Sequence, residues 1–178
     1  YDPLNMMKKI NYNGEKQVEF QYNPLGQLTE MKDWLGVTKF DLDPLGRILE
    51  VTDFENKTTK YTWTNTGEKE SITYPDGSEV NYQYDNLGRL TEVQDAIGKV
   101  TEYSYDEIGN LTERILPNGS QTQYMYDAIS NIKEQKEIDP QGRTIDAMHY
   151  EYDRAGNTTR IYKNKSDLDE EAEEGEDR

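Results

Sequence analysis

Few side chains in this 178-residue sequence have the types and spacing that catalysis or metal binding requires. The chain has a single histidine, His149, and no cysteine, so a thiolate nucleophile, a disulfide and a His/Cys metal site are all excluded. The serines do not lie in a nucleophile-elbow motif, and no glycine-rich phosphate loop precedes a predicted helix. We therefore predict no catalytic residue, no metal ligand and no cofactor.

Aspartates recur at matching positions, which raises the question of calcium binding. Calcium loops bring several oxygen ligands together at close spacing, as in D-x-D-x-D, and that pattern is absent here. An aspartate at the first position of a turn instead accepts hydrogen bonds from the backbone that follows it. We expect this turn-capping role for five residues: Asp43, Asp85, Asp106, Asp127 and Asp153.

Aromatic side chains are the remaining candidates for ligand binding, because their flat apolar faces can stack on sugar rings. Of the 14 tyrosines, 11 occur at positions that repeat along the chain, so packing within the fold is their expected role. Trp34 and Phe54 differ, because they lie at matching places in two consecutive predicted turns. If exposed, they could contact either a carbohydrate or another run of repeats.

The elements that carry these residues form a regular repeat. Tyr84-Asp85-Asn86-Leu87-Gly88-Arg89-Leu90 returns 21 residues later at 105–111, and again at 126–132. Counting variants, eight such anchors begin at residues 1, 22, 42, 63, 84, 105, 126 and 152. A fixed period of this size is typical of a stacked repeat array. The longer last step predicts a longer hairpin near the end.

The strand that enters each anchor alternates with period two, so its aromatic residues share one face and polar residues occupy the other. Stacked hairpins would align these aromatics in two columns. The repeated structural positions are Tyr22, Tyr61, Trp63, Tyr82, Tyr84, Tyr103, Tyr105, Tyr124, Tyr126, Tyr150 and Tyr152, with the turn glycines Gly88 and Gly109.

Each repeat also has two turns. Asp85–Gly88 fits a type I turn followed by a left-handed glycine, and we call this position the anchor turn. The second turn is more variable, as in Asp95–Gly98. In the strand that returns from each anchor turn, the apolar residues lie three or four apart, which predicts a β-bulge just after the glycine. The expected fold is all-β, with tandem antiparallel hairpins of about 21 residues forming a curved or spiralling ribbon.

Charge and composition limit the possible partners. The net charge is −16, which argues against nucleic acid, and no apolar run is long enough for a transmembrane helix. We expect one array over residues 1–163 and an acidic tail over 164–178. The tail is predicted to be disordered, with a short helix capped by Ser166 as the alternative. No signal peptide opens the sequence, which starts within a repeat, so we expect a piece of a longer protein.

The unit Y-D-x-x-G-R/N-L-T-E-V, followed by D-x-x-G and T-x-Y-x-Y-D, resembles the YD repeat of the Rhs family over residues 1 to about 163. This family includes bacterial wall-associated and polymorphic-toxin proteins, toxin-complex C components and the animal teneurins. The resemblance implies hairpins that spiral into a hollow β-shell around a C-terminal toxin. The paired D-P-x-G-L motifs of the family's self-cleaving protease are absent, since Asp43–Gly46 is followed by Arg47.

The function implied is a non-catalytic structural segment of a secreted or cell-surface bacterial shell. The expected partners are the remainder of the same shell and its enclosed C-terminal domain, with edge-to-edge self-association also possible. The alternative is a carbohydrate-binding module that uses Trp34 and Phe54 on surface glycans.

Overall fold

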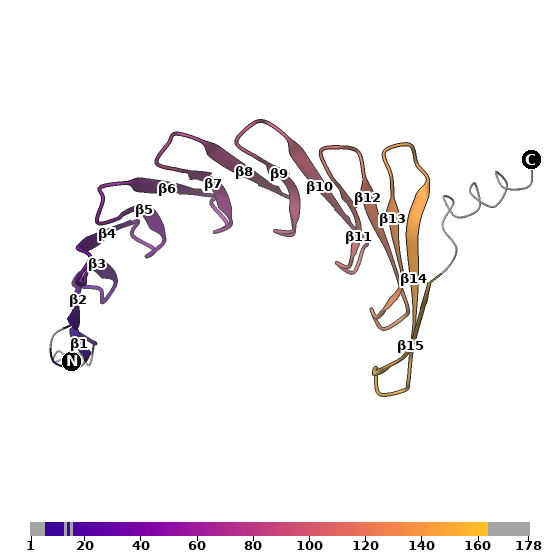
Figure 1. The fold of residues 1–178 in the computed structure, drawn as a ribbon, viewed down its shortest axis with the longest axis horizontal. Helices are drawn as coiled ribbons and strands as arrows, with labels where there is room; N and C mark the ends of the chain where they lie inside the picture. Colours follow the sequence, from indigo (N-terminus) through magenta and orange to yellow (C-terminus); the bar gives the residue numbers. More distant parts are fainter. Residues whose placement is uncertain (1–5, 13, 15, 164–178) are drawn as a thin grey trace, which may run out of the picture. The chain divides into compact units, whose positions relative to one another are not determined.

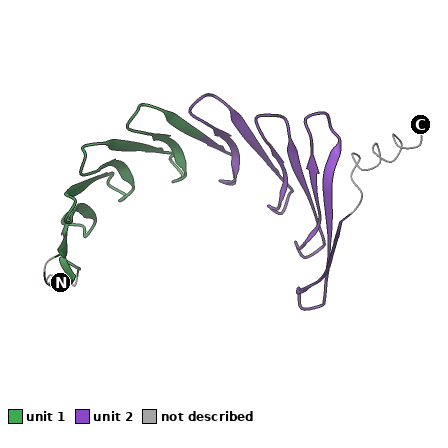
Figure 2. Ribbon diagram, viewed as in Figure 1, with its two compact units in different colours: residues 1–81 green, residues 82–178 purple. Residues whose placement is uncertain are grey.

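A computed structural model describes residues 6–12, 14 and 16–163 of the chain. Within these residues the fold is all-β, with antiparallel strands and no helix, as the repeat predicted. The chain divides into two compact units, residues 1–81 and 82–178 (Figure 2). The first anchor, Tyr1–Asn5, and the acidic tail with its alternative helix lie outside the described residues.

In unit 1 each strand pairs antiparallel with the next along the chain (Figure 1). The strands are β1 (Lys9–Tyr12), β2 (Lys16–Tyr22), β3 (Leu28–Lys32), β4 (Val37–Leu42), β5 (Ile48–Thr52), β6 (Thr58–Trp63), β7 (Lys69–Thr73) and the beginning of β8 (Glu79–Tyr84). The chain passes through an anchor turn after each even-numbered strand and through a second turn after each odd-numbered one. The two kinds of turn therefore lie at opposite ends of the hairpins.

Unit 2 continues the same pattern of hairpins. Its strands are the end of β8, β9 (Leu90–Gln94), β10 (Val100–Tyr105), β11 (Leu111–Ile115), β12 (Gln121–Tyr126), β13 (Ile132–Ile138), β14 (Thr144–Tyr152) and β15 (Thr158–Lys163). The pair formed by β13, with 7 residues, and β14, with 9, is longer than the 5- and 6-residue strands β9 to β12. This confirms the longer hairpin that the 26-residue step predicted.

The anchor turns have the predicted geometry. At Asp85–Gly88 the amide of Gly88 donates to the carbonyl of Asp85 at 3.0 Å, and Gly88 has a φ of 76°. The amide of Asp85 donates to the carbonyl of Arg89 at 2.9 Å and closes the loop. In the anchor turn Asp127–Ser130, serine replaces the glycine, and Ser130 still adopts a positive φ of 66°. The repeat therefore keeps the left-handed conformation even where its usual residue is lost.

The bulge predicted in the returning strand is present. Tyr105 pairs with Leu111 while Ser104 pairs with Glu113, so Thr112 is the extra residue. The same shift occurs beside other anchor turns, for example between Gln21 and Tyr22. An extra residue increases the local twist and turns the next side chains to the other face. This explains why the apolar residues of these strands do not alternate strictly.

One second turn accounts for the irregular spacing of the anchors. The pairs Lys32–Val37 and Thr52–Thr58 show that the turn at 33–36 is one residue shorter than the turn at 53–57. In the shorter turn the amide of Asp33 bonds to the carbonyl of Gly36, three residues on. The step from Tyr22 to Leu42 is therefore 20 residues instead of 21.

The tyrosine columns do not form a closed core. Among the described residues only Val18 and Ala147 are buried apolar residues, and Tyr103 and Tyr105 are half-buried. The hairpins form a single layer, so each ring is covered by its neighbours along the sheet and not by a second layer. Stability must therefore depend strongly on contacts between adjacent hairpins.

Candidate functional site

The anchor aspartates cap their turns, as predicted. The Oδ1 atom of Asp85 accepts hydrogen bonds from the amides of Leu87, at 2.9 Å, and Arg89, at 3.0 Å. The hydrogen bonds from the backbone and then the side chain of Arg89 hold the pKa of Asp85 below its ordinary value. Equivalent capping bonds occur at the other four aspartates, Asp43, Asp106, Asp127 and Asp153. These carboxylates are therefore occupied by the turn itself.

Arginine at the residue after the turn glycine joins one hairpin to the next. The Nε atom of Arg89 donates to Asp85 Oδ2 at 2.6 Å, and its Nη1 donates to the carbonyl of Asp106 at 2.9 Å. Its guanidinium also lies 4.9 Å from the ring centroid of Tyr105. In unit 1 Arg47 makes the same contacts, with the Thr64 carbonyl at 3.0 Å. One side chain thus connects two successive anchor turns.

An aromatic residue just before several of the anchor turns makes a second connection. The hydroxyl of Tyr105 donates to the carbonyl of Leu90 at 2.8 Å, 15 residues back. The hydroxyl of Tyr126 donates in the same way to the carbonyl of Leu111 at 2.7 Å. At Trp63 in unit 1, the indole Nε1 makes the equivalent bond to the carbonyl of Ile48 at 2.8 Å. Burial raises the pKa of Tyr105 above its ordinary value, as expected for a neutral donor held in place. The polar tips of these aromatics therefore fix the spacing between hairpins.

Trp34 and Phe54, the two residues set apart by the sequence, are both exposed. Their exposed fractions are 53% and 48%. The Trp34 ring meets Tyr12 edge-on at 6.1 Å, and Lys16 Nζ lies 4.9 Å from its centroid. A Cβ built on Gly36 would lie 2.7 Å from Phe54 Cβ, so Phe54 packs over the preceding second turn. Both rings keep free apolar surface at the second-turn end of unit 1.

A row of aliphatic side chains at the anchor turns was not singled out from the sequence. The third residue of most anchor turns is a leucine or isoleucine, and these residues are among the most exposed large apolar residues in the described part of the chain. Their exposed fractions are 74% for Leu25, 77% for Leu45, 75% for Leu87, 74% for Ile108 and 72% for Ile129. The signal that could have revealed them is the repeated L/I at a turn position that normally takes a polar residue.

His149 has a structural environment. Its ring stacks on Tyr162 at 5.1 Å, and Nε2 lies 3.2 Å from Glu134 Oε1. In the part of the chain that the structure describes, no group of three or more His, Asp or Glu side chains is arranged to hold a metal ion. The same residues contain no helix that is long and apolar enough to cross a membrane.

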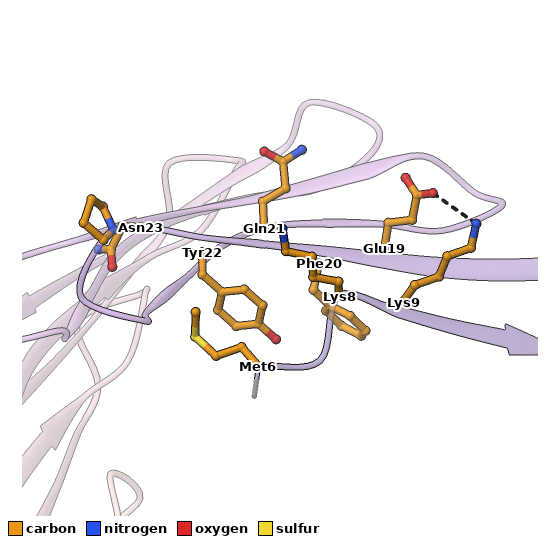
Figure 3. A pocket seen from close by; sticks show the side chains of 9 residues that line it. Met6, Lys8, Lys9, Glu19, Phe20, Gln21, Tyr22 and Asn23 are labelled. Atoms are coloured by element: carbon orange, nitrogen blue, oxygen red, sulfur yellow. Dashed lines mark ion pairs between the residues drawn. The ribbon is translucent and has the colours of Figure 1, made fainter. Parts of the chain in front are cut away.

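A concavity with a volume of about 730 Å³ lies at the start of unit 1 (Figure 3). Met6, Phe20 and Tyr22 line it with Lys8, and Lys9 pairs with Glu19 at 3.5 Å on its rim. It is open to solvent. Its lining includes no nucleophile with an adjacent base, so it does not form a catalytic constellation.

Comparison with known proteins is consistent with this geometry. The chain is similar in fold to solved structures of TcdB2-TccC3-Cdc42, with 17% identity and a TM-score of 0.69, and of TcdB2-TccC3 without its hypervariable C-terminal region, with 17% identity and a TM-score of 0.70. A Photorhabdus luminescens Tc holotoxin pore also matches, with 17% identity and a TM-score of 0.69. Each match covers 86% of this chain but only 9% of the other.

No curated protein matches the sequence. The model of the teneurin YD-shell family, however, matches residues 1–169, which is nearly the whole chain. The matched range contains the sequences of all eight anchors, and with them the capped turns and the connections between hairpins described above. This chain belongs to the teneurin YD-shell family.

Proposed function

We propose that the chain is a non-catalytic structural segment of a longer YD-repeat shell, secreted or at a bacterial cell surface, that encloses a C-terminal toxin domain. The observation that carries this proposal is the chain of inter-hairpin contacts, such as Arg89 to the carbonyl of Asp106. Arg89 bonds to the next hairpin through the Asp106 carbonyl, and Tyr105 bonds to the preceding one through the Leu90 carbonyl. The partners proposed are the remainder of the same shell and its enclosed domain.

The single-layer construction supports this role. A sheet with two buried apolar residues among those described has little core of its own, so each hairpin depends on its neighbours. The matched structures are about eleven times longer than the part that this chain covers. A short run of hairpins would gain its function by joining many more of the same kind.

The size of the polypeptide that the cell produces tests this proposal. An antibody raised against the 178-residue chain should detect, in the culture supernatant or surface fraction, a polypeptide several times larger than 20.7 kDa. Protease added to the native material should leave the domain that follows the array intact, and mild denaturant should expose it. Two results would contradict the proposal: a cellular polypeptide of only 20.7 kDa, or a following domain that the protease cuts as fast as it cuts an unfolded polypeptide.

Exposure of Trp34 and Phe54 favours a second candidate function, binding of a surface glycan. The chain has two tryptophans, and Trp63 is half-buried with its Nε1 bonded to Ile48, so a sugar stacking on the second-turn end would act on Trp34. Titration of oligosaccharides should then change the fluorescence of the wild-type chain but not of Trp34→Phe. An unchanged spectrum across a glycan panel would refute this candidate.

A further inference from the structure

Strand β13 lacks the apolar pattern that specifies strand register in unit 1. There, the residue opposite the first aromatic of an entering strand is apolar, as with Val51 opposite Phe40. The matching residue of β13 is Gln135, opposite Tyr124, and it lies within five consecutive polar residues, 133–137. A strand that is polar on both faces specifies its pairing weakly and is prone to slip.

The anchor turn that joins β12 to β13 also holds its two strands less firmly. In the seven described anchor turns, the residue with a positive φ is a glycine in six and Ser130 in this one. A side chain makes the left-handed conformation less favourable, because its Cβ approaches the following carbonyl oxygen. The turn and the strand of this hairpin therefore both leave its register weakly specified.

A relay of hydrogen bonds crosses this hairpin on the face that carries the tyrosines. Nη2 of Arg114, in β11, donates to Oγ1 of Thr122 at 3.0 Å, and that hydroxyl donates to Oε2 of Glu137 at 2.9 Å. Thr122 lies opposite Arg114 on one side and opposite Glu137 on the other. Only 1% of Thr122 is exposed. Since a hydroxyl has one proton to donate, the relay uses the whole donor capacity of a buried group.

The relay belongs to a row of charges that is costly within a sheet. Nε of Arg114 and Oδ1 of Asp146 are buried and, among the described residues, have no hydrogen-bond partner. Lys163 pairs with the other oxygen of Asp146 at 3.3 Å. Asp146 also lies opposite Glu137, and like charges that face each other across strands are destabilising. Because apolar replacements of a buried charge network often leave stability unchanged or raise it, conformational specificity explains the row better than stability does.

We propose that the relay is a register lock, which selects the pairing of β12 with β13 in which Glu137 faces Thr122. A slip of two residues would keep every side chain on its own face, but it would bring Gln135 or Asp139 opposite Thr122. Gln135 carries no charge, and the Asp139 carboxylate already accepts bonds from the amides of its own turn. Only the native pairing therefore gives the Thr122 hydroxyl a carboxylate that balances Arg114.

The lock sets the position of more than one strand. A slip of two residues moves β13 by about 7 Å along the strand direction, at 3.2–3.4 Å per residue. Strand β14 pairs with β13, and β15 pairs with β14, so both would move with it. The relay thus determines where the last strands of unit 2 lie. The lock acts within the array and does not depend on an enclosed domain.

Competition between two disulfides measures the register. The chain has no cysteine, so introduced thiols can be followed without interference. The first triple variant is Gln123→Cys, Glu134→Cys, Lys136→Cys. Gln123 lies opposite Lys136, so a disulfide between positions 123 and 136 reports the native pairing, and one between 123 and 134 reports a slip of two residues. A second triple, with Ile138→Cys in place of Glu134→Cys, reports the opposite slip.

Two substitutions remove the lock, and a third is a matched control. Thr122→Val removes the central hydroxyl. Glu137→Ala removes the acceptor and also relieves the repulsion from Asp146, so the fold should be retained. Thr101→Val makes the first change one repeat earlier, where the described hydrogen bonds include no such relay. Each full-length variant is equilibrated in a glutathione redox buffer, tandem mass spectrometry gives the ratio of slipped to native disulfide, and far-UV circular dichroism checks the fold.

We expect each lock variant to raise the slipped-to-native ratio at least about tenfold in one of the two triples, because a hydrogen bond to a charged group favours the native register by at least that factor. Thr101→Val should leave the ratio unchanged. An unchanged ratio in folded Thr122→Val or Glu137→Ala overturns the proposal. So does an equal rise in Thr101→Val, or a slipped disulfide that predominates while the relay is intact. If Thr122→Val does not fold, Glu137→Ala decides alone.

Discussion

The arginine between consecutive anchor turns provides the sharpest test of how the array is held together. Arg89 bonds to its own turn through Asp85 and to the next turn through the carbonyl of Asp106. Asn110 occupies the matching place one repeat later and bonds to Asp106 Oδ2 within its own turn. Exchanging the two residue types should therefore remove one connection between hairpins and create another, while each turn keeps its internal bond.

The magnitudes follow from the interactions that each substitution removes or adds. A hydrogen bond from a charged donor contributes about 1.5–3 kcal/mol, and a cation–π contact at an exposed site about 0.5–1 kcal/mol. The Arg89 side chain is 27% exposed, which places it toward the lower end of both ranges. We expect Arg89→Asn to destabilise the chain by about 2 kcal/mol. Asn110→Arg should stabilise it by about 1 kcal/mol, because ordering the longer side chain offsets part of the gain.

Urea unfolding followed by far-UV circular dichroism measures both changes, and hydrogen exchange of the Gly109 amide reports on the receiving turn. Exchange at Gly109 should speed up in Arg89→Asn, since the carbonyl of Asp106 accepts both bonds. Destabilisation of similar size by both substitutions, or no change in either, would refute the view that arginine stabilises the array by joining hairpins.

Three further predictions concern pH and backbone strain. Burial acts to raise the pKa of Asp106, but the hydrogen bonds from Asn110, Ile108 and Gly109 together hold it below the ordinary value of 3.8. Its contribution to stability is therefore complete above pH 3.8 and is lost as pH falls through the lowered pKa, so the melting temperature of Asp106→Asn should fall less in acid than that of wild type. Burial raises the pKa of Tyr105, so this residue has the opposite effect: its contribution to stability is complete below pH 10.0 and is lost as pH rises above that value. The melting temperature of Tyr105→Phe should therefore fall less in alkali than that of wild type. Gly36→Ala should destabilise more than Gly98→Ala, because the new Cβ would meet Phe54 at 2.7 Å in the first case and open space in the second; equal urea midpoints would contradict this.

The sequence was sufficient to predict the local structure of each repeat. Aspartate and glycine three residues apart, as in Asp85 and Gly88, favour a turn by themselves, because the aspartate side chain caps the backbone and glycine accepts a positive φ. The bulge at Thr112 followed from the broken alternation of its strand. Period two and the 21-residue step then predicted hairpins in chain order. All of these features depend on residues close together in the sequence.

The tertiary structure decided which groups meet across hairpins and which remain exposed. Nothing local shows that the Tyr105 hydroxyl reaches Leu90, or that Arg89 reaches the carbonyl of Asp106, because both depend on the stagger between neighbouring hairpins. The half-buried state of the tyrosine rings was likewise decided by the absence of a second layer. Leu87 carries the apolar side chain typical of a core, yet its place at the tip of a turn leaves it 75% exposed. Burial depends on what the rest of the chain places nearby, and that is a property of the assembled sheet.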